Sequence, residues 1–291
     1  MRNEVYGGDV LRTLRKGMSG EDVRYLQYTL GITADGSFGP ATLNAVKAYQ
    51  KSKGLSVDGS VGPATQKSLG LSDFIVHIYD KSQVWFAGHP YNATTKPLYN
   101  LKAWAIKEKA DYVFNLAFFN MSGVGSDQYG VIKGRTVTYL KAKGYDVGYG
   151  GTSEKLTIDA NNICAGYKVG IVNGKAKSVS LTGKRARNAN GLLKDGRYFH
   201  VQSVTTATEH ELVQYMLKNY DVELLLIQDA GGSTGFYDRK KDVLLAGERE
   251  GTNGRPVASV VCVKEKAITD RPIVTVKVCP CYGQVIKEGL V

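Results

Sequence analysis

The residues best suited to chemistry in this 291-residue chain follow a run of apolar residues in the segment LLLIQDAGGSTGFY, residues 224–237. Asp229 ends the strand-like run, and Gly231, Gly232, Ser233 and Thr234 come after it. Glycines let a backbone approach a ligand closely, and the two hydroxyls add hydrogen-bond donors. The segment could therefore hold an anion or a sugar-phosphate beside a carboxylate. A strand-ending turn without a ligand is the alternative that this segment alone leaves open.

The remaining reactive residue types do not form a second constellation. The four histidines form no HExxH motif, and none pairs with a cysteine at metal-ligand spacing. His77 and His200 lie inside strand-like segments, where we expect structural histidines. Cys262 lies in VASVVCV and is expected to pack rather than react. No metal site and no cofactor is predicted.

The residues after the glycines disfavour a serine nucleophile. Residues 231–235, GGSTG, fit the G-x-S-x-G pattern formally. A nucleophile elbow opens into a helix, whereas FYDRKKDVLLAG predicts a strand, a charged turn and a second strand. Asp229 therefore remains the main candidate.

The elements that must position these residues change character near residue 72. Within residues 1–72, DGSFGPAT at 35–42 recurs as DGSVGPAT at 58–65. Asp-Gly predicts a turn, and Gly-Pro predicts a helix that starts with proline in its first turn. SGEDVRYLQYTLG and ATLNAVKAYQKSKG carry apolar residues at helical spacing. We predict a small three-helix bundle here.

Residues 73–291 predict a mixed α/β (α+β) domain with a central, mostly buried sheet. FIVHIY and QVWFAG predict a hairpin around residues 80–82, and Asn173-Gly174 and Asp195-Gly196 predict two further hairpin turns. Thr208 with Glu211 predicts a helix capping box. The next apolar run, VELLLI, predicts a central strand that is covered on both faces.

The charge of the chain favours anionic partners. Lys and Arg number 38 against 27 Asp and Glu, which gives a net charge of +11. Such a charge attracts polyanions, among them phosphate-rich wall polymers. The basic residues are scattered and no single basic helix stands out, so a nucleic-acid partner is not predicted. The N-terminus has no apolar signal region and no run is long enough to span a membrane, so we expect cytoplasmic synthesis without a signal peptide.

Residues 14–71 resemble the peptidoglycan-binding domain type 1 family. The resemblance is carried by the two Asp-Gly and Gly-Pro repeats and by helix residues such as Val23, Leu26 and Gln27. It implies anchoring to bacterial peptidoglycan without catalysis. The candidates for stacking on wall sugars are Tyr25, Tyr28 and Tyr49.

Residues 74–264 resemble the phosphodiester glycosidase family. Four motifs occur in the family's order: NLAFF at 115–119, RNANG at 187–191 with Asp195-Gly196 after it, DAGGST at 229–234, and NGRPVA at 253–258. The resemblance implies hydrolysis of a sugar-1-phosphodiester at the anomeric carbon. That reaction needs a carboxylate, and cations that hold the phosphate.

The resemblance implies a role for each matching residue. Asp229 is the key carboxylate, with Glu248 or Glu250 as the second. Two arginines, Arg187 and Arg255, are expected to clamp the phosphate. The residues expected to orient the substrate are Asn115, Gly231, Gly232, Ser233 and Thr234.

Together the two halves predict a hydrolase directed to the bacterial cell wall, with the layout of a phage endolysin. The expected partners are peptidoglycan and anionic wall polymers. A glucosaminidase or muramidase activity is one alternative. A non-catalytic wall-binding or virion structural protein is another, because Leu116, Ala117 and Ala230 stand where the family has glycines, and Gly254 stands where it has glutamate.

Overall fold

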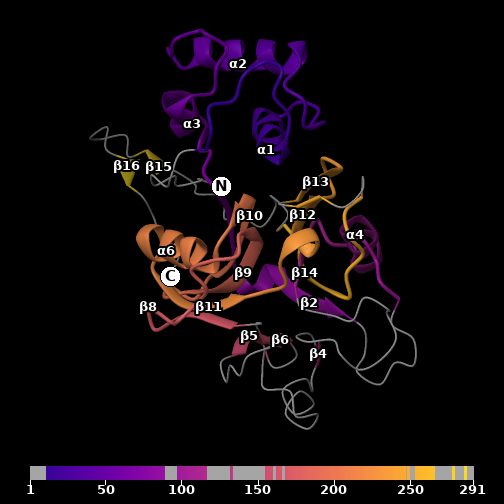
Figure 1. The fold of residues 1–291 in the computed structure, drawn as a ribbon. Helices are drawn as coiled ribbons and strands as arrows, with labels where there is room; N and C mark the ends of the chain where they lie inside the picture. The colour runs from indigo at the N-terminus through magenta and orange to yellow at the C-terminus, as the bar shows by residue number, and fades with distance from the viewer. Residues whose placement is uncertain are drawn as a thin grey trace.

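The computed structural model of the chain describes residues 11–88, 97–116, 132–133, 155–159, 162–165, 168–246, 248–249, 253–265, 277–278 and 285–286. A small group of helices lies at one end of the molecule, and the remaining described residues form two large β-sheets with further helices and smaller groups of strands (Figure 1). No helix among these residues has the length and apolar character needed to cross a membrane.

The N-terminal helices follow the sequence repeat. They are α1 (Glu21–Leu30), α2 (Pro40–Ser52) and α3 (Pro63–Leu69), and α2 and α3 each start with the proline of a Gly-Pro pair. In each repeat a buried glutamine ties the Asp-Gly turn to the next helix: Gln27 Nε2 donates to Asp35 Oδ1 at 2.7 Å, and Gln50 Nε2 donates to Asp58 Oδ1 at 2.8 Å. The predicted three-helix bundle is confirmed.

The larger sheet has six strands, all in antiparallel pairs. Their spatial order is β1 (Phe74–Tyr79), β10 (Tyr198–Ala207), β9 (Arg185–Leu193), β11 (Val222–Ile227), β7 (Lys168–Val172) and β8 (Lys175–Ala176). Helix α6 (Glu209–Asn219) begins at the predicted Thr208–Glu211 capping box and covers one face of this sheet. The Asn173-Gly174 and Asp195-Gly196 turns join β7 to β8 and β9 to β10, as predicted.

The second sheet has five antiparallel strands. Their order is β13 (Val243–Ala246), β12 (Gly235–Asp238), β3 (Tyr112–Asn115), β14 (Ser259–Val263) and β2 (Val84–Gly88). Helix α4 (Leu101–Glu108) covers its outer face, where the fully buried Trp104 donates its indole N–H to the Val257 carbonyl at 2.9 Å. Cys262 is buried in the same cluster, as predicted.

Smaller elements complete the described chain. Two short 3₁₀ turns, η1 (Lys81–Gln83) and η2 (Gly231–Ser233), follow β1 and β11. Short strands β4 (Ile132–Lys133), β6 (Asn162–Ala165) and β5 (Lys155–Asp159) form a third sheet, and β15 (Lys277–Val278) pairs with β16 (Val285–Ile286). Cys279 and Cys281 lie outside the described residues.

The two large sheets pack face to face between the two helices. Phe114 and Phe236 of the smaller sheet share one buried cluster with Tyr198 and Leu226 of the larger sheet. The mixed α+β class is confirmed, and β11 is covered on both faces as predicted. The predicted central buried sheet is in fact two sheets that face each other, with the principal core between them.

The predicted hairpin between β1 and β2 is wrong. β1 belongs to the six-stranded sheet and β2 to the five-stranded sheet, so the chain crosses between the sheets at residues 80–83. Asp80 caps η1 by accepting from the Ser82 amide at 2.8 Å, which turns the chain away from pairing. Two apolar runs around a short polar turn satisfy either arrangement, because both bury the same side chains.

Two histidines face the core between the sheets, where His200 is fully buried and His77 is partly buried. His77 of β1 is directly opposite His200 of β10, and their rings pack on Phe236 and Phe114 with centroids 4.4 and 4.2 Å apart. Neither ring nitrogen of His200 has a hydrogen-bond partner among the described residues. Burial lowers the pKa of His77 to about 4 and holds that of His200 well below its ordinary value, so both rings are neutral.

The helical bundle docks onto one end of the two sheets through α1, next to β10 and β13. Leu26 and Val46 belong to the same continuous buried cluster as Phe236. At the rim of this contact, Arg249 Nε donates to Glu21 Oε1 at 2.6 Å. The Tyr28 hydroxyl donates to Asp238 Oδ2 at 3.0 Å.

Candidate functional site

The candidate site lies at the end of β11, where the two sheets approach each other. The Asp229 amide donates to the Leu116 carbonyl, which follows β3 of the other sheet, at 3.1 Å. The Asp229 carbonyl accepts from Asn188 Nδ2 of β9 at 2.5 Å and from Asn115 Nδ2 of β3 at 3.4 Å. Asn115 Oδ1 in turn accepts from Asn188 Nδ2 at 3.0 Å and from the Gly235 amide at 3.1 Å. Two buried amides therefore hold this strand end in one position.

The Asp229 carboxylate is mostly removed from water. The residue is 6% exposed, and the Ala230 amide donates to Oδ1 at 2.8 Å. Desolvation is the largest influence and raises the pKa of Asp229 to about 6. The hydrogen bonds from Ser233 and Ala230, and the nearby positive charges of Arg255 and Arg185, act in the opposite direction. The result is a carboxyl group that exchanges a proton near neutral pH.

A glycine allows an arginine to lie beside this carboxylate. Gly231 adopts a left-handed backbone with φ of +69°, and a Cβ atom there would lie 2.7 Å from Arg185 Nη2. Glu248 accepts from Arg185 Nε at 3.2 Å and from the Ala186 amide at 2.6 Å. The structure thus brings Glu248 to the same side of β9 as Arg185. Glu250 lies outside the described residues.

The hydroxyl-bearing turn η2 closes the other side of the site. Arg255 Nη1 donates to Ser233 Oγ at 3.4 Å, which brings the NGRPVA segment to the strand end. Thr234 Oγ1 donates to the Ala186 carbonyl at 3.2 Å. Both hydroxyl-bearing residues and Gly232 are buried. The segments around Asn115, Asp229 and Arg255, far apart in the sequence, therefore meet in one place.

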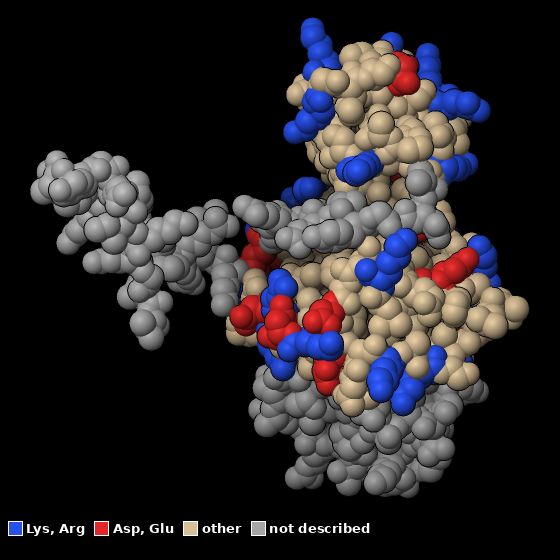
Figure 2. All heavy atoms as spheres, turned by 90° about the vertical axis from the view of Figure 1, so that its left-hand side faces the viewer, with Lys and Arg blue, Asp and Glu red and all other residues tan. Residues whose placement is uncertain are grey.

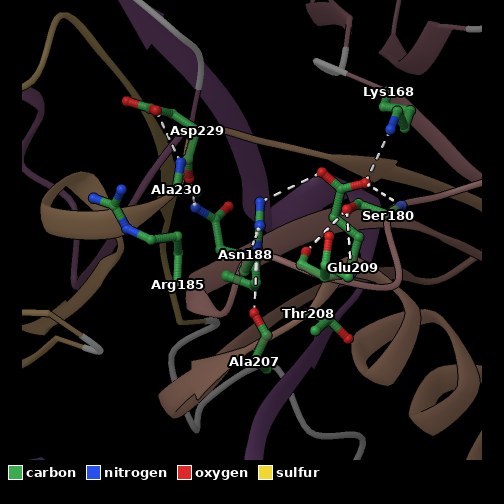
Figure 3. Close-up of polar contacts among 12 residues, drawn as sticks. Lys168, Ser180, Arg185, Asn188, Ala207, Thr208, Glu209, Asp229 and Ala230 are labelled. Atoms are coloured by element: carbon green, nitrogen blue, oxygen red, sulfur yellow. Dashed lines mark hydrogen bonds and ion pairs between the residues drawn. The ribbon is translucent and has the colours of Figure 1, made fainter.

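Arg187 is not brought together with them. Its guanidinium donates to the Gly183 carbonyl at 2.7 Å and the Ala207 carbonyl at 3.3 Å, and it pairs with Glu209 Oε1 at 3.4 Å. Glu209 also accepts from Lys168 Nζ at 3.0 Å. In Figure 3, Glu209 and Lys168 lie on the opposite side of Asn188 from Asp229 and Arg185. This set of contacts fastens the start of α6 to the sheet.

The three candidate wall-binding tyrosines have different surroundings. Tyr25 is buried in the core shared with the sheets. Tyr28 is half-buried against the sheet domain, where Lys241 Nζ lies 3.9 Å from its ring centroid. The Tyr49 hydroxyl donates to the Ser68 carbonyl at 2.7 Å and so braces α2 against α3.

Arg185 and Asn188 were not singled out by the sequence analysis. Asn188 lies inside the RNANG motif, but no spacing to another residue marks an asparagine within a strand as functional. Arg185 and Arg187 are two residues apart, so strand alternation directs both to the same face. Their surroundings differ because Arg187 pairs with Glu209, whereas Arg185 pairs with Glu248. Among the described residues, no group of three or more His, Cys, Asp or Glu could hold a metal ion.

Comparison with solved structures gives low-identity likenesses over about two thirds of the chain. The zebrafish N-acetylglucosamine-1-phosphodiester alpha-N-acetylglucosaminidase catalytic domain is similar with a TM-score of 0.45 and 13% identity, over 67% of this chain and 85% of that chain. A hypothetical protein from Synechocystis has a TM-score of 0.44 and 11% identity, over 66% of this chain and 59% of that chain.

Another solved structure has a higher identity over a shorter part of the chain. A peptidoglycan-binding protein from Clostridioides difficile is 45% identical with a TM-score of 0.20, over 20% of this chain and 40% of that chain. No curated protein matches the chain. Residues 19–69 match the family model of the putative peptidoglycan binding domain. The chain thus carries a segment that matches the family model of the putative peptidoglycan binding domain, followed by the two-sheet domain described above.

Proposed function

We propose that this protein is a cell-wall-targeted hydrolase that cleaves a glycosidic or sugar-1-phosphodiester bond in peptidoglycan or in a polymer attached to it. The observation that carries the proposal is Asp229, a buried carboxyl group at a strand end with a pKa of about 6, between two arginines. A buried carboxyl group of raised pKa is the usual proton donor of glycoside hydrolysis.

Asp229 is proposed to donate its proton to the oxygen that leaves the anomeric carbon, while water adds to that carbon and gives a proton to Glu248. The amides that hold the Asp229 backbone, from Asn188 and Asn115, keep the carboxyl group oriented without titrating. Orientation of this kind is what makes a side chain an effective proton donor.

Arg185 and Arg255 are proposed to hold the negative charge of a phosphodiester. Both act electrostatically on the Asp229 carboxyl group. A guanidinium suits a phosphate because it can donate two parallel hydrogen bonds. Arg185 takes the role that the sequence suggested for Arg187. Glu248, paired with Arg185, is the proposed second carboxylate.

Residues 19–69 are proposed to bring the hydrolase to its substrate, which fits an endolysin-like role at the wall. Among the charged side chains on this part of the molecule, blue Lys and Arg are more frequent than red Asp and Glu on the face that Figure 2 shows. The positive charge of these side chains favours binding to an anionic wall.

The test is digestion of purified bacterial walls, intact and stripped of teichoic acid, with mass analysis of the released fragments. Wild-type protein is expected to release fragments with new sugar ends, and Asp229→Asn is expected to lower the rate by at least about a hundredfold. Arg197→Gln, at an exposed local ion pair with Asp195, is the matched control and keeps the activity. Binding without any fragment release would instead support a non-catalytic wall-binding protein.

The pH dependence tests the assigned role of Asp229. A proton donor with a pKa of about 6 works below that pH, so kcat/KM is expected to fall about tenfold per unit above pH 6. The measurement is initial rates of wall digestion between pH 4.5 and 8. Activity that rises through pH 6 would contradict the donor role and assign Asp229 to work in its ionised form.

A further inference from the structure

A cavity of about 600 Å³ lies where the helical bundle meets the sheet domain. One wall comes from α1 and the loop after it, including Arg24, Tyr28 and residues 31–34. The other comes from α4, the β12–β13 hairpin and the segment after it. Figure 1 places α1 beside β12 and β13 at this end of the molecule. None of the site residues around Asp229 lines this cavity, so it is a separate place.

The lining of the cavity is strongly basic. Among the described residues that line it, Arg24 of α1, Lys102 of α4, Lys241 of the β12–β13 turn and Arg249 contribute four cationic side chains, against one carboxylate, Asp242. These cations come from four separate segments of the chain. Their charges add within one concave surface, and such a surface concentrates an anion more than scattered charges do.

Two of the four cations build the cavity. Arg249 Nε and Nη2 donate to the two Glu21 oxygens at 2.6 and 3.0 Å. Arg24 donates to the carbonyl groups of Ala34 and Asp35, the latter at 2.8 Å, and holds the loop after α1. The Arg249–Glu21 pair joins the two walls and Arg24 fixes the loop on one of them, so the cavity keeps its shape without a ligand.

The other two cations face the opening. Lys241 is exposed, and its Nζ lies 3.9 Å from the centroid of the Tyr28 ring. Lys102 pairs with Asp242 at 2.8 Å, in a contact whose side chains are 46% and 62% exposed. An exposed pair of this kind contributes little free energy, so an incoming phosphate can replace the carboxylate at small cost.

Two tyrosines give the cavity a partly aromatic lining. Tyr28 comes from the bundle and Tyr237 from β12, and each hydroxyl is held by a carboxylate: Tyr28 by Asp238 at 3.0 Å and Tyr237 by Asp242 at 2.7 Å. With the hydroxyls held, the rings have few alternative positions. An aromatic ring with its polar end anchored suits the C–H surface of a sugar or polyol.

We propose that this cavity binds a polyol-phosphate chain, the chemistry of an anionic wall polymer, at a site that both parts of the protein must form together. Phosphates contact Lys102 and Lys241 at the opening, and the polyol carbons lie against Tyr28. Binding here needs no hydrolysis and therefore does not depend on the role of Asp229. It selects walls that carry such polymers.

The test is calorimetric titration of the full chain with a defined glycerol-phosphate oligomer, which contains no glycosidic bond. Lys102→Gln and Lys241→Gln are each expected to weaken binding by roughly two- to fivefold, and the double variant by about tenfold. The affinity of the wild type is expected to fall with added salt. Lys194→Gln, at an exposed pair with Asp221 on the β9–β10 turn, is the matched control and keeps the affinity.

Three further arms separate the possible sources of binding. Arg185→Gln removes a phosphate contact proposed for the Asp229 site, and the binding that Lys102→Gln and Lys241→Gln weaken is expected to persist in this variant. Complete loss of binding in Arg185→Gln would place the oligomer at the Asp229 site and overturn the proposal. A neutral chitin oligomer and an oligonucleotide are expected to bind at least tenfold more weakly. Equal or tighter binding of either one, or unchanged affinity in the double lysine variant, would also overturn it.

Discussion

Folding removes the Asp229 carboxyl group from water, and the cost of that burial depends on pH. Its pKa is about 6 in the folded protein and 3.8 as an ordinary value, so the folded state holds the proton more tightly. The stability linked to this proton is complete below pH 3.8 and is lost as the pH rises through 6. The difference between the two pKa values corresponds to about 3 kcal/mol of unfolding free energy.

Asp229→Asn removes this titration. Its unfolding free energy is expected to match that of the wild type near pH 3.8 and to exceed it by up to about 3 kcal/mol above pH 7. Chemical denaturation at several pH values measures the difference. Asp221→Asn, whose side chain is 78% exposed, is the control with no such trend. A variant less stable than the wild type at pH 8 would contradict the burial cost assigned to Asp229.

The paired core histidines give the opposite pH trend. The pKa of His77 falls from 6.5 to about 4 on folding, so the folded protein keeps the ring neutral. The associated stability is complete above pH 6.5 and is lost as the pH falls through 4. His77→Phe keeps the aromatic contacts and cannot titrate.

The advantage of His77→Phe over the wild type is therefore expected to grow by about 3 kcal/mol between pH 7.5 and pH 4. Guanidinium denaturation at both pH values measures it. A constant difference would show that His77 does not titrate on unfolding.

At the residue scale, the sequence predicts the features that a local pattern determines. The repeated DG and GP dipeptides, the Thr208 cap and the strand-end position of Asp229 all depend on neighbours within a few residues. The choice between Arg185 and Arg187 depends on Glu209, more than twenty residues away in the chain. No local pattern carries that information.

At the scale of elements, the pairing of β9 with β11 depends on a close approach of backbone to backbone. A Cβ atom on Gly191 would lie 1.8 Å from the Leu224 carbonyl oxygen of β11 and 2.8 Å from Phe199. Neither strand can move freely, because each is paired on both sides. These strands carry Asn188 and lead to Asp229, so their separation sets the geometry of the site.

Gly191→Ala is expected to destabilise the protein by at least about 3 kcal/mol, because the added methyl group forces the strands apart. Thermal unfolding followed by circular dichroism measures this. Gly39→Ala, where a Cβ atom would meet nothing within 4 Å, changes only the N-cap of α2 and is expected to cost no more than about 1 kcal/mol. Equal stability of the two variants would contradict the close approach of β9 and β11.

The wrong prediction of a hairpin between β1 and β2 also has its cause at the scale of elements. Strand existence depends on local apolar runs, and β1 and β2 were both expected. Burial sets the partners of the two strands. Phe74 of β1 packs in the cluster that includes α6, and Ala87 of β2 packs in the cluster that includes α4. Alternating patterns alone do not distinguish a hairpin from a crossing between facing sheets.

At the scale of the whole molecule, the bundle and the sheets share one buried cluster. The Glu21–Arg249 pair at its rim has side chains that are 17% and 19% exposed. Removing one partner of such a pair leaves a partly buried charge, at a cost of about 1 to 3 kcal/mol. We therefore expect cooperative unfolding of both parts in the wild type.

Arg249→Gln is expected to lower the melting temperature by several degrees and to expose the junction near residue 72 to proteases. Calorimetry and limited proteolysis measure these effects. Arg197→Gln, at the exposed local pair with Asp195, is the control without either change. Two separate melting transitions in the wild type would contradict a shared core.

The shared cluster also limits how freely the parts of this chain can be exchanged. Leu26 and Val46 of the bundle lie in the same core as Phe236, and Tyr28 reaches Asp238 across the junction. A chimera that replaced the bundle with an unrelated wall-binding module would leave apolar surface and a buried carboxylate at the graft uncovered. Portable fusions need the α1 face of the bundle to be transplanted together with the β12–β13 hairpin that it covers.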